Sequence, residues 1–378
     1  MQAVARKLPR QFARRRQRGV AALVLVLLLG LALSVSLFGM IRSHASEARE
    51  DTAQTERALA LAKEALIAYA SGRDASNRPG ELPCPDTTND GTAENICSTP
   101  ASRIGRLPWA TLGIPDLRDG SGERLWYAVS DRFKRNPALT PLNSNTPGQL
   151  SVTGMAPAAN VIAIVFAPGA VVGAQSRVAA NVNNVAHYLE GENANGDTVF
   201  ATAASSATFN DRLLAITPTL FFPAVEIAVA RHLRIALNTY YNLNHYYPPA
   251  NAYGGTCIAA NQGLLPADPS TCGGGHAPFG FLPTWFVPNQ WQSILLYAVA
   301  PACVSRSALY CSGTSGLLTV NGNSAHVVLF SPGAPVTGQP RPCTSHTDCL
   351  EAPNTASYPV FTQINNIATN NDRMVMVP

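Results

Sequence analysis

The pattern of hydrophobic and polar positions separates a helical N-terminal stretch from a longer body of short strands. Residues 20–41 are an uninterrupted run of apolar and small residues. Residues 43–69 contain no Gly or Pro and are dominated by residue types that favour helix. Apolar residues recur there every three or four positions and predict one buried helix face: Leu59, Ala62, Leu66 and Tyr69. The pattern predicts one helix of about 50 residues, roughly 75 Å long, ending near Ser71-Gly72.

Beyond this helix, short apolar runs bounded by Gly, Pro and Asn predict β-strands. In the first half of the body the predicted strands are Arg124–Ser130, Leu150–Thr153, Val161–Phe166 and Leu213–Thr217. In the second half they are Ile294–Ala300, Leu317–Val320, Val327–Phe330 and Met374–Val377. Because a helix comes first and the strands follow, we expect an α+β fold rather than a doubly wound sheet.

The two halves of the body are an internal repeat. Phe166-Ala167-Pro168-Gly169-Ala170 recurs as Phe330-Ser331-Pro332-Gly333-Ala334, and Asn210-Asp211-Arg212 recurs as Asn371-Asp372-Arg373. Further matches follow in the same order: Leu125 and Tyr127 with Leu295 and Tyr297, Cys84 and Cys97 with Cys257 and Cys272, and the segment Ala58–Tyr69 with Val225–Tyr240. One duplicated ancestral unit explains this order. We therefore predict two tandem heads, residues 71–222 and 223–378, each a helix packed on an antiparallel β-sheet.

The N-terminus determines the expected compartment. Residues 1–19 contain seven Lys or Arg and no acid, so the rest of the chain is slightly negative and has no global reason to bind nucleic acid. Residues 20–41 would form a helix of about 33 Å, enough to cross a hydrocarbon core of about 30 Å. A cytoplasmic basic end then predicts a single-pass inner-membrane protein with periplasmic heads. The alternative is a secretory signal cleaved near Ser43-His44-Ala45.

A family resemblance arises at this N-terminus. Arg18-Gly19-Val20, followed by the apolar segment and an amphipathic extension, resembles the class III leader and first helix of type IV pilins and type II secretion pseudopilins. The resemblance implies that a prepilin peptidase cuts between Gly19 and Val20 and that the new N-terminus is methylated. Residues 1–19 would then be the leader and residues 20–70 the transmembrane and assembly helix. Val24 occupies the position where the family usually has Glu. In the family, the absence of this Glu is tolerated in the large minor subunit at the filament tip.

The resemblance continues into the first head. The segment Asp119–Tyr127 resembles the D-P-W-G-N-P-x-x-Y segment of pseudopilin heads, with Asp119, Gly122 and Tyr127 at matching positions. It implies a minor pilin or pseudopilin of a type II secretion or type IV pilus machine, possessing a bulky double head suited to the filament tip. The implied partners are other pilins through the N-terminal helix, the prepilin peptidase and the inner membrane.

Composition and motifs leave a binding protein as the alternative to a structural subunit. Charged residues make up only 13% of the chain, and 28 Gly and 29 Pro are typical of a loop-rich secreted body. The sequence has no G-x-S-x-G, H-E-x-x-H or P-loop motif, so we expect no enzyme. Tyr240-Tyr241 and Tyr246-Tyr247, near His245, either stack on carbohydrate or pack in the core. An anchored adhesin that recognises glycan or protein would use such a surface.

Eight cysteines in a translocated body indicate disulfides. Their spacing favours four local pairs: Cys84–Cys97, Cys257–Cys272, Cys303–Cys311 and Cys343–Cys349. Zinc is the alternative: the segment Cys343–Cys349 contains three potential ligands, and His276 lies four residues after Cys272. However, no two cysteines have the spacing of two to four residues that zinc sites favour.

One loop offers calcium ligands, and we expect no other cofactor. Asp86, Thr88, Asp90 and Glu94 place oxygens at positions 1, 3, 5 and 9 of an EF-type loop, with Gly91 at position 6. The resemblance adds support, because pseudopilin heads often hold calcium. Cys97 occupies position 12, where such a loop has a bidentate acid. The alternative is an Asx-rich turn bracketed by a disulfide.

Overall fold

The computed structural model describes residues 13–74, 77–135, 141–255, 257–272, 274–304, 311, 316–335, 339–364 and 370–377. For residues 13–24, 36–45, 100, 101, 258, 259 and 356 within these ranges, only the backbone is described. The chain divides into two compact units, Met1–Gln54 and Thr55–Pro378. Both repeats belong to the second unit.

Helix α1 runs from Ala13 to Ser71, 59 residues, and contributes to both units. Its last turns bury the apolar face that the spacing predicts: Leu59, Ala62 and Leu66 are buried, as are Ala58 and Ala70, whereas Tyr69 is half-buried. The helix ends where Gly72 follows Ser71, as the sequence predicts.

The expectation of a long N-terminal membrane-spanning helix leading into two heads is wrong, and so is the single-pass inner-membrane location built on it. Among the residues whose side chains are described, no helix combines the length and the hydropathy needed to cross a membrane. Crossing a bilayer takes about 20 consecutive apolar residues, and the described side chains of α1 provide no such stretch.

The first repeat contains two sheets. The larger one has the strand order β1-β2-β5-β7 and is antiparallel throughout. Its strands are β1 (Ile104–Arg106), β2 (Trp126–Val129), β5 (Ala163–Ala167) and β7 (Arg212–Ile216). The smaller sheet has the order β4-β3-β6, with β3 and β6 parallel. Its strands are β4 (Ala158–Val161), β3 (Leu150–Gly154) and β6 (Val199–Thr202).

The second repeat has two corresponding sheets, of which the larger is extended by two further strands. Its larger sheet has the order β16-β14-β11-β10-β8-β9, and its smaller sheet the order β13-β12-β15 with β12 and β15 parallel. The larger sheet consists of β8 (Ala250–Asn251), β9 (Cys257–Ala260), β10 (Gln262–Leu264), β11 (Leu296–Val299), β14 (Val327–Ser331) and β16 (Arg373–Val377). The smaller one consists of β12 (Leu318–Val320), β13 (Asn323–Ala325) and β15 (Val360–Phe361).

Strand register is alike at matching positions of the two repeats. Tyr127 of β2 lies opposite Gly105 and Val165, and Tyr297 of β11 lies opposite Gly263 and Leu329. Phe166 and Phe330, matched in the sequence repeat, face Trp126 and Leu296 respectively. The residue opposite each of these tyrosines on the neighbouring strand has to be glycine. A Cβ at Gly263 would lie 2.0 Å from the Asn251 carbonyl oxygen, and one at Gly105 would lie 2.7 Å from the Asp86 carbonyl oxygen.

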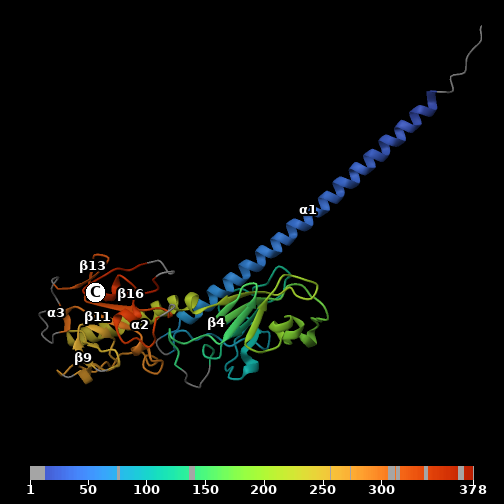
Figure 1. The fold of residues 1–378 in the computed structure, drawn as a ribbon. Coiled ribbons are helices and arrows are strands. Elements are labelled where there is room, and N and C mark those ends of the chain that lie inside the picture. The colour runs from blue at the N-terminus through green and yellow to red at the C-terminus, as the bar shows by residue number, and fades with distance from the viewer. Residues whose placement is uncertain are drawn as a thin grey trace, which may run out of the picture. The chain divides into compact units, whose positions relative to one another are not determined.

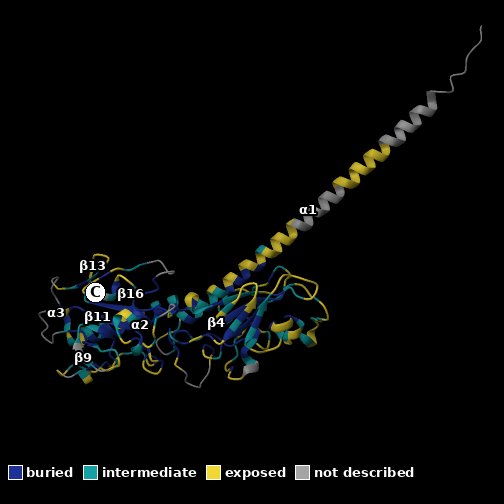
Figure 2. Ribbon diagram, viewed as in Figure 1, coloured by how far each residue is buried: buried dark blue, intermediate teal, exposed yellow. Residues whose placement is uncertain are grey.

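Helix α2 (Pro218–Asn244) packs on β14 and β16 of the second repeat (Figure 1). Proline at its first position has the fixed φ that a helix start favours. At its N-terminal end, Phe221 and Phe222 contact Phe133 of the first repeat with ring centroids 5.7 and 6.0 Å away. One hydrophobic core therefore runs through both repeats, and the strands that form it appear as the dark blue interior of Figure 2.

Short helices complete the connections. They are η1 (Pro100–Arg103), η2 (Ala179–Asn181), η3 (Val185–His187), η4 (Gly191–Ala194), η5 (Pro269–Cys272), η6 (Trp291–Ser293), α3 (Pro301–Val304), α4 (His346–Cys349) and η7 (Asn354–Ala356).

Candidate functional site

The described part of α1 in the first unit presents an exposed apolar run (Figure 2). Its large side chains are 56–69% exposed: Leu25, Val26, Leu27, Leu28, Leu29, Leu31, Leu33 and Val35. The run includes Gly30, whose Cβ position has no atom within 4 Å, and Ser34, whose hydroxyl donates to the Gly30 carbonyl oxygen. A helix that is apolar on every side is normally buried, so this run is a candidate assembly surface.

The predicted processing site falls in the same helix. Gly19 and Val20 lie within α1, but their side chains, like that of Val24, are outside the described residues. Cleavage after Gly19 stays a prediction.

The four disulfides are the four local pairs that the spacing predicts. Cys84–Cys97, Cys257–Cys272, Cys303–Cys311 and Cys343–Cys349 are all bonded. The zinc alternative at Cys343 and Cys349 would need their thiolates, which the disulfide consumes.

Removing the first disulfide is expected to destabilise the heads. Cys84 and Cys97 are both 1% exposed and close a loop with a sequence separation of 13. Replacing both by alanine should lower the free energy of unfolding by about 3 kcal/mol, because the unfolded chain regains the entropy of an open loop. Urea denaturation measures the difference. Under reducing conditions the variant and the natural chain should converge, and a difference that persists there would show that the loss comes from packing instead.

In the proposed calcium loop, the carboxylates accept backbone N–H groups. Asp86 Oδ1 accepts from the N–H groups of Thr88 (2.9 Å) and Asn89 (2.6 Å), and Asp86 Oδ2 accepts from Gly91 N–H (2.7 Å). Asp90 Oδ1 accepts from the N–H of Thr92, and Glu94 Oε1 from that of Thr87. These are the bonds of an Asx-rich turn, so the structure places the four residues in the alternative arrangement. Calcium binding stays a prediction.

A tight contact fixes this turn. Gly91 has φ +85°, and a Cβ there would lie 2.4 Å from the Trp109 ring. Glycine is thus the residue that both the backbone conformation and the contact with Trp109 require.

A buried cluster in the first repeat, which we call carboxyl pair 1, consists of Glu190 and Asp211. Glu190 Oε2 accepts from the N–H groups of Asn210 and Asp211, each at 3.0 Å, and its Oε1 accepts from the Gln175 side chain at 2.6 Å. Asp211 Oδ2 accepts from the Glu190 N–H and from the Asn193 side chain, both at 2.9 Å. The two acids thus bind one another's backbone and join the loop before η4 to the start of β7.

Carboxyl pair 2, Glu351 and Asp372, repeats most of this arrangement, except that the Asp372 N–H donates to the Asn370 side chain at 3.2 Å and not to the glutamate. Glu351 Oε2 accepts from Asn371 N–H at 3.1 Å, its Oε1 accepts from the Gln339 side chain at 2.6 Å, and Asp372 Oδ2 accepts from Glu351 N–H at 3.1 Å. In both pairs an asparagine follows the glutamate by three residues, and its side chain plays the same part. The Asn193 side chain hydrogen-bonds the N–H and the C=O of Ala201, and the Asn354 side chain hydrogen-bonds those of Thr362.

The aspartate of each pair has a raised pKa. Burial, together with the neighbouring carboxyl of Glu190, raises the pKa of Asp211 to about 8. The hydrogen bonds from Glu190 N–H and Asn193 act in the opposite direction and lower this pKa. Burial and Glu351 likewise raise the pKa of Asp372 to about 8. In both pairs the aspartate Oδ1 is buried without a donor among the described residues. A neutral aspartic acid beside a glutamate avoids two buried negative charges.

Sequence reasoning found only half of these clusters. The repeat of Asn-Asp-Arg was evident, whereas Leu-Glu-x-x-Asn, residues 189–193 and 350–354, was missed although it recurs in the sequence. Repetition of this second motif is the signal that would have revealed the pairs.

Another buried acid lies at the junction of the repeats. Glu226 of α2 is fully buried, and its Oε1 accepts a hydrogen bond from the Ser144 hydroxyl of the first repeat. Burial raises the pKa of Glu226 to about 7, against the opposing effects of Ser144 and of Arg341 and Arg373.

The tyrosine patch belongs to the core. Tyr240, Tyr246 and Tyr247 are buried, and Tyr241 stacks on Tyr247 with centroids 4.9 Å apart. His245 terminates α2 in the left-handed conformation, with φ 62°. This is the packing alternative and not an open carbohydrate surface.

Comparison of the chain with protein-family models, with curated proteins and with solved structures finds no match. The function is therefore inferred from the geometry of these sites.

Proposed function

We propose that this chain is a structural subunit with a duplicated pilin-like head, which joins an assembly of similar subunits through α1. The observation that supports the proposal is the exposed apolar run, Leu25–Val35, on a helix of 59 residues. Within the first unit these side chains have no described partner that buries them, so a neighbouring helix is the natural cover. A filament of the type II secretion or type IV pilus kind packs such helices side by side.

The energetics favour helix–helix packing over solvent exposure. Fully burying one Leu or Val side chain is worth about 1.5–3 kcal/mol, and the run carries eight large apolar side chains. Burying even half of this surface offsets much of the cost of association. Small residues such as Gly30 and Ser34 in this run let helix backbones approach closely.

The heads suit a structural role at the end of an assembly. The core that runs through both repeats and the hydrogen-bonded junction at Glu226 make the two heads one body. A double head occupies more room than a single one and would disturb a regular lattice of single heads. We therefore propose that the subunit initiates or terminates a filament and does not tile its shaft.

Polar substitution within the apolar run should abolish co-assembly. In Leu28→Gln/Leu31→Gln, two side chains that are 58% and 65% exposed become polar and would be buried without partners in a helix bundle. We expect at least a tenfold loss of co-assembly with a single-headed pilin-like subunit, measured by co-sedimentation of filaments. The matched control is Met155→Gln, an apolar residue 73% exposed in the first repeat.

The control should co-assemble like the natural chain, and thermal unfolding of the heads should be the same for all three proteins. If Leu28→Gln/Leu31→Gln co-assembles as well as the control, α1 is not the assembly surface and the proposed function fails.

A further inference from the structure

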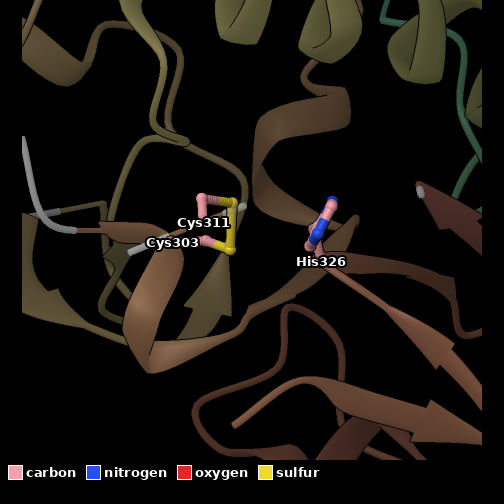
Figure 3. A group of neighbouring side chains, drawn as sticks. All are labelled: Cys303, Cys311 and His326. Atoms are coloured by element: carbon pink, nitrogen blue, oxygen red, sulfur yellow. A yellow bond between two sulfur atoms is a disulfide. The ribbon is translucent and has the colours of Figure 1, made fainter. Parts of the chain in front are cut away.

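The second repeat brings two cysteines and a histidine together. The sulfur atoms of Cys303 and Cys311 and a ring nitrogen of His326 lie within 4.8 Å of one another. Figure 3 shows the His326 ring next to the disulfide. Among the described residues, no other set of three or more Cys, His, Asp or Glu side chains converges in this way.

The first repeat shows which residues this part of the fold requires. The hydrogen bond from Cys303 N–H to Ala300 O (2.8 Å) corresponds to that from Phe133 N–H to Ser130 O (2.9 Å). Cys303 O accepts from Tyr247 N–H at 2.8 Å, and Phe133 O accepts from Leu82 N–H at the same distance. Cys303 therefore occupies the position of Phe133.

His326 corresponds to Ile162 by the same criterion. Ala300 N–H donates to His326 O and Ser130 N–H donates to Ile162 O, both at 2.8 Å. Phe133 and Ile162 are fully buried apolar residues, so the fold does not require a sulfur or nitrogen atom at these two positions. The second repeat has exchanged both for metal-ligating residues that converge.

His326 packs against two tyrosines, but one of its ring nitrogens has no hydrogen-bond partner among the described residues. Its ring lies 6.2 Å from both Tyr241 and Tyr247, nearly parallel to Tyr241 at 21°. Its Nδ1 is buried with no hydrogen-bond partner among the described residues. An unsatisfied buried nitrogen costs free energy, and coordination to a cation would remove that cost.

We propose that Cys303, Cys311 and His326 form a redox-gated site for a thiophilic divalent cation such as Zn²⁺. In the oxidised chain the disulfide blocks the site. A dithiol reductant supplies two electrons and two protons, which convert the disulfide into two thiols while the reductant becomes a disulfide. Zn²⁺ then displaces both thiol protons and binds two thiolates and the imidazole nitrogen, with water as the fourth ligand.

The geometry fits such a site. Zinc binds thiolate sulfur at about 2.3 Å and imidazole nitrogen at about 2.0 Å, so its ligand atoms lie roughly 3.5–4 Å apart. The observed separations of 4.8 Å or less reach this range by rotation of the side chains once the sulfur–sulfur bond is broken. Three protein ligands and an open fourth position describe a site that can exchange its metal or bind a further ligand.

The test is cobalt and zinc titration of the full chain reduced with a phosphine. Bound Co²⁺ should give a thiolate-to-cobalt charge-transfer band at one equivalent, Zn²⁺ should displace it, and the oxidised chain should give no band. His326→Ile, which introduces the first repeat's residue, should weaken Co²⁺ binding at least tenfold without changing thermal unfolding of the oxidised chain. Cys303→Ala/Cys311→Ala should remove the band.

The matched control is Cys84→Ala/Cys97→Ala, which removes a disulfide from the first repeat and should leave the band and the affinity intact. Because all four disulfides are reduced in this experiment, the comparison between variants identifies the site. Equal Co²⁺ affinity in His326→Ile and the natural chain, or a band that survives loss of Cys303 and Cys311, would overturn the proposal.

Discussion

Replacing Glu190 by alanine is expected to lower the free energy of unfolding by about 3–5 kcal/mol. The Glu190 carboxylate accepts from the buried N–H of Asp211, from the partly buried N–H of Asn210 and from the Gln175 side chain. Alanine removes the acceptor of all three donors, of which the Asp211 N–H is buried away from water. The substitution also removes the carboxyl group that interacts with the buried Asp211 side chain. Urea denaturation of the natural chain and the variant measures the loss.

The neighbouring acid provides the control. Glu192 lies two residues away, is exposed, and binds only the Asn195 side chain among the contacts described for it. Glu192→Ala should change stability by no more than about 0.5 kcal/mol. Glu351 accepts from one backbone N–H, that of Asn371, and from the Gln339 side chain, and it is half-buried. Glu351→Ala should therefore also be destabilising, but less so than Glu190→Ala. If Glu190→Ala costs no more than Glu192→Ala, the carboxyl pairs do not hold the fold together.

The sequence predicts well the elements that local pattern determines. Each of the eight predicted strands has an observed counterpart, and Val161–Phe166 and Val327–Phe330 occupy corresponding central positions in their sheets. Apolar runs between Gly, Pro and Asn mark buried strands, and the internal repeat doubles the evidence for each of them. Local cysteine spacing was equally informative, because short loops bring their ends together readily.

Features that depend on distant residues escaped prediction. The parallel pairs β3–β6 and β12–β15 join strands far apart in the sequence, and nothing in Val199–Thr202 indicates its partner. A glutamate is mostly exposed in proteins, so burial of Glu190 cannot be read from its type. In the Asp86 loop the oxygen atoms expected of a calcium site are present, but those of Asp86 accept hydrogen bonds from backbone N–H groups. The composition of the loop does not reveal these hydrogen bonds.

The stability of the heads is expected to fall as pH rises from about 4 to about 8. Asp211 and Asp372 have pKa values raised from 3.8 to about 8 on folding, by burial first and then by Glu190 and Glu351. Between these values the folded chain keeps protons that the unfolded chain loses, so deprotonation favours unfolding. Each such proton lowers the free energy of unfolding by up to about 1.4 kcal/mol per pH unit. Glu226 adds to the slope between 4.5 and about 7.

An amide in place of the protonated acid should reduce this dependence to the part that comes from Glu226. In Asp211→Asn/Asp372→Asn, the side-chain oxygen still accepts from the N–H of the paired glutamate. The amide can also donate to the glutamate carboxylate, with which the aspartic acid side chain is in hydrogen-bond contact. We expect the variant to show a shallower slope between pH 4 and 8 and, above pH 8, to be at least as stable as the natural chain. Urea denaturation at a series of pH values measures both. A variant that keeps the full slope, or is less stable at every pH, would show that the aspartates are ionised in the folded chain and that the pairs bind each other as charges.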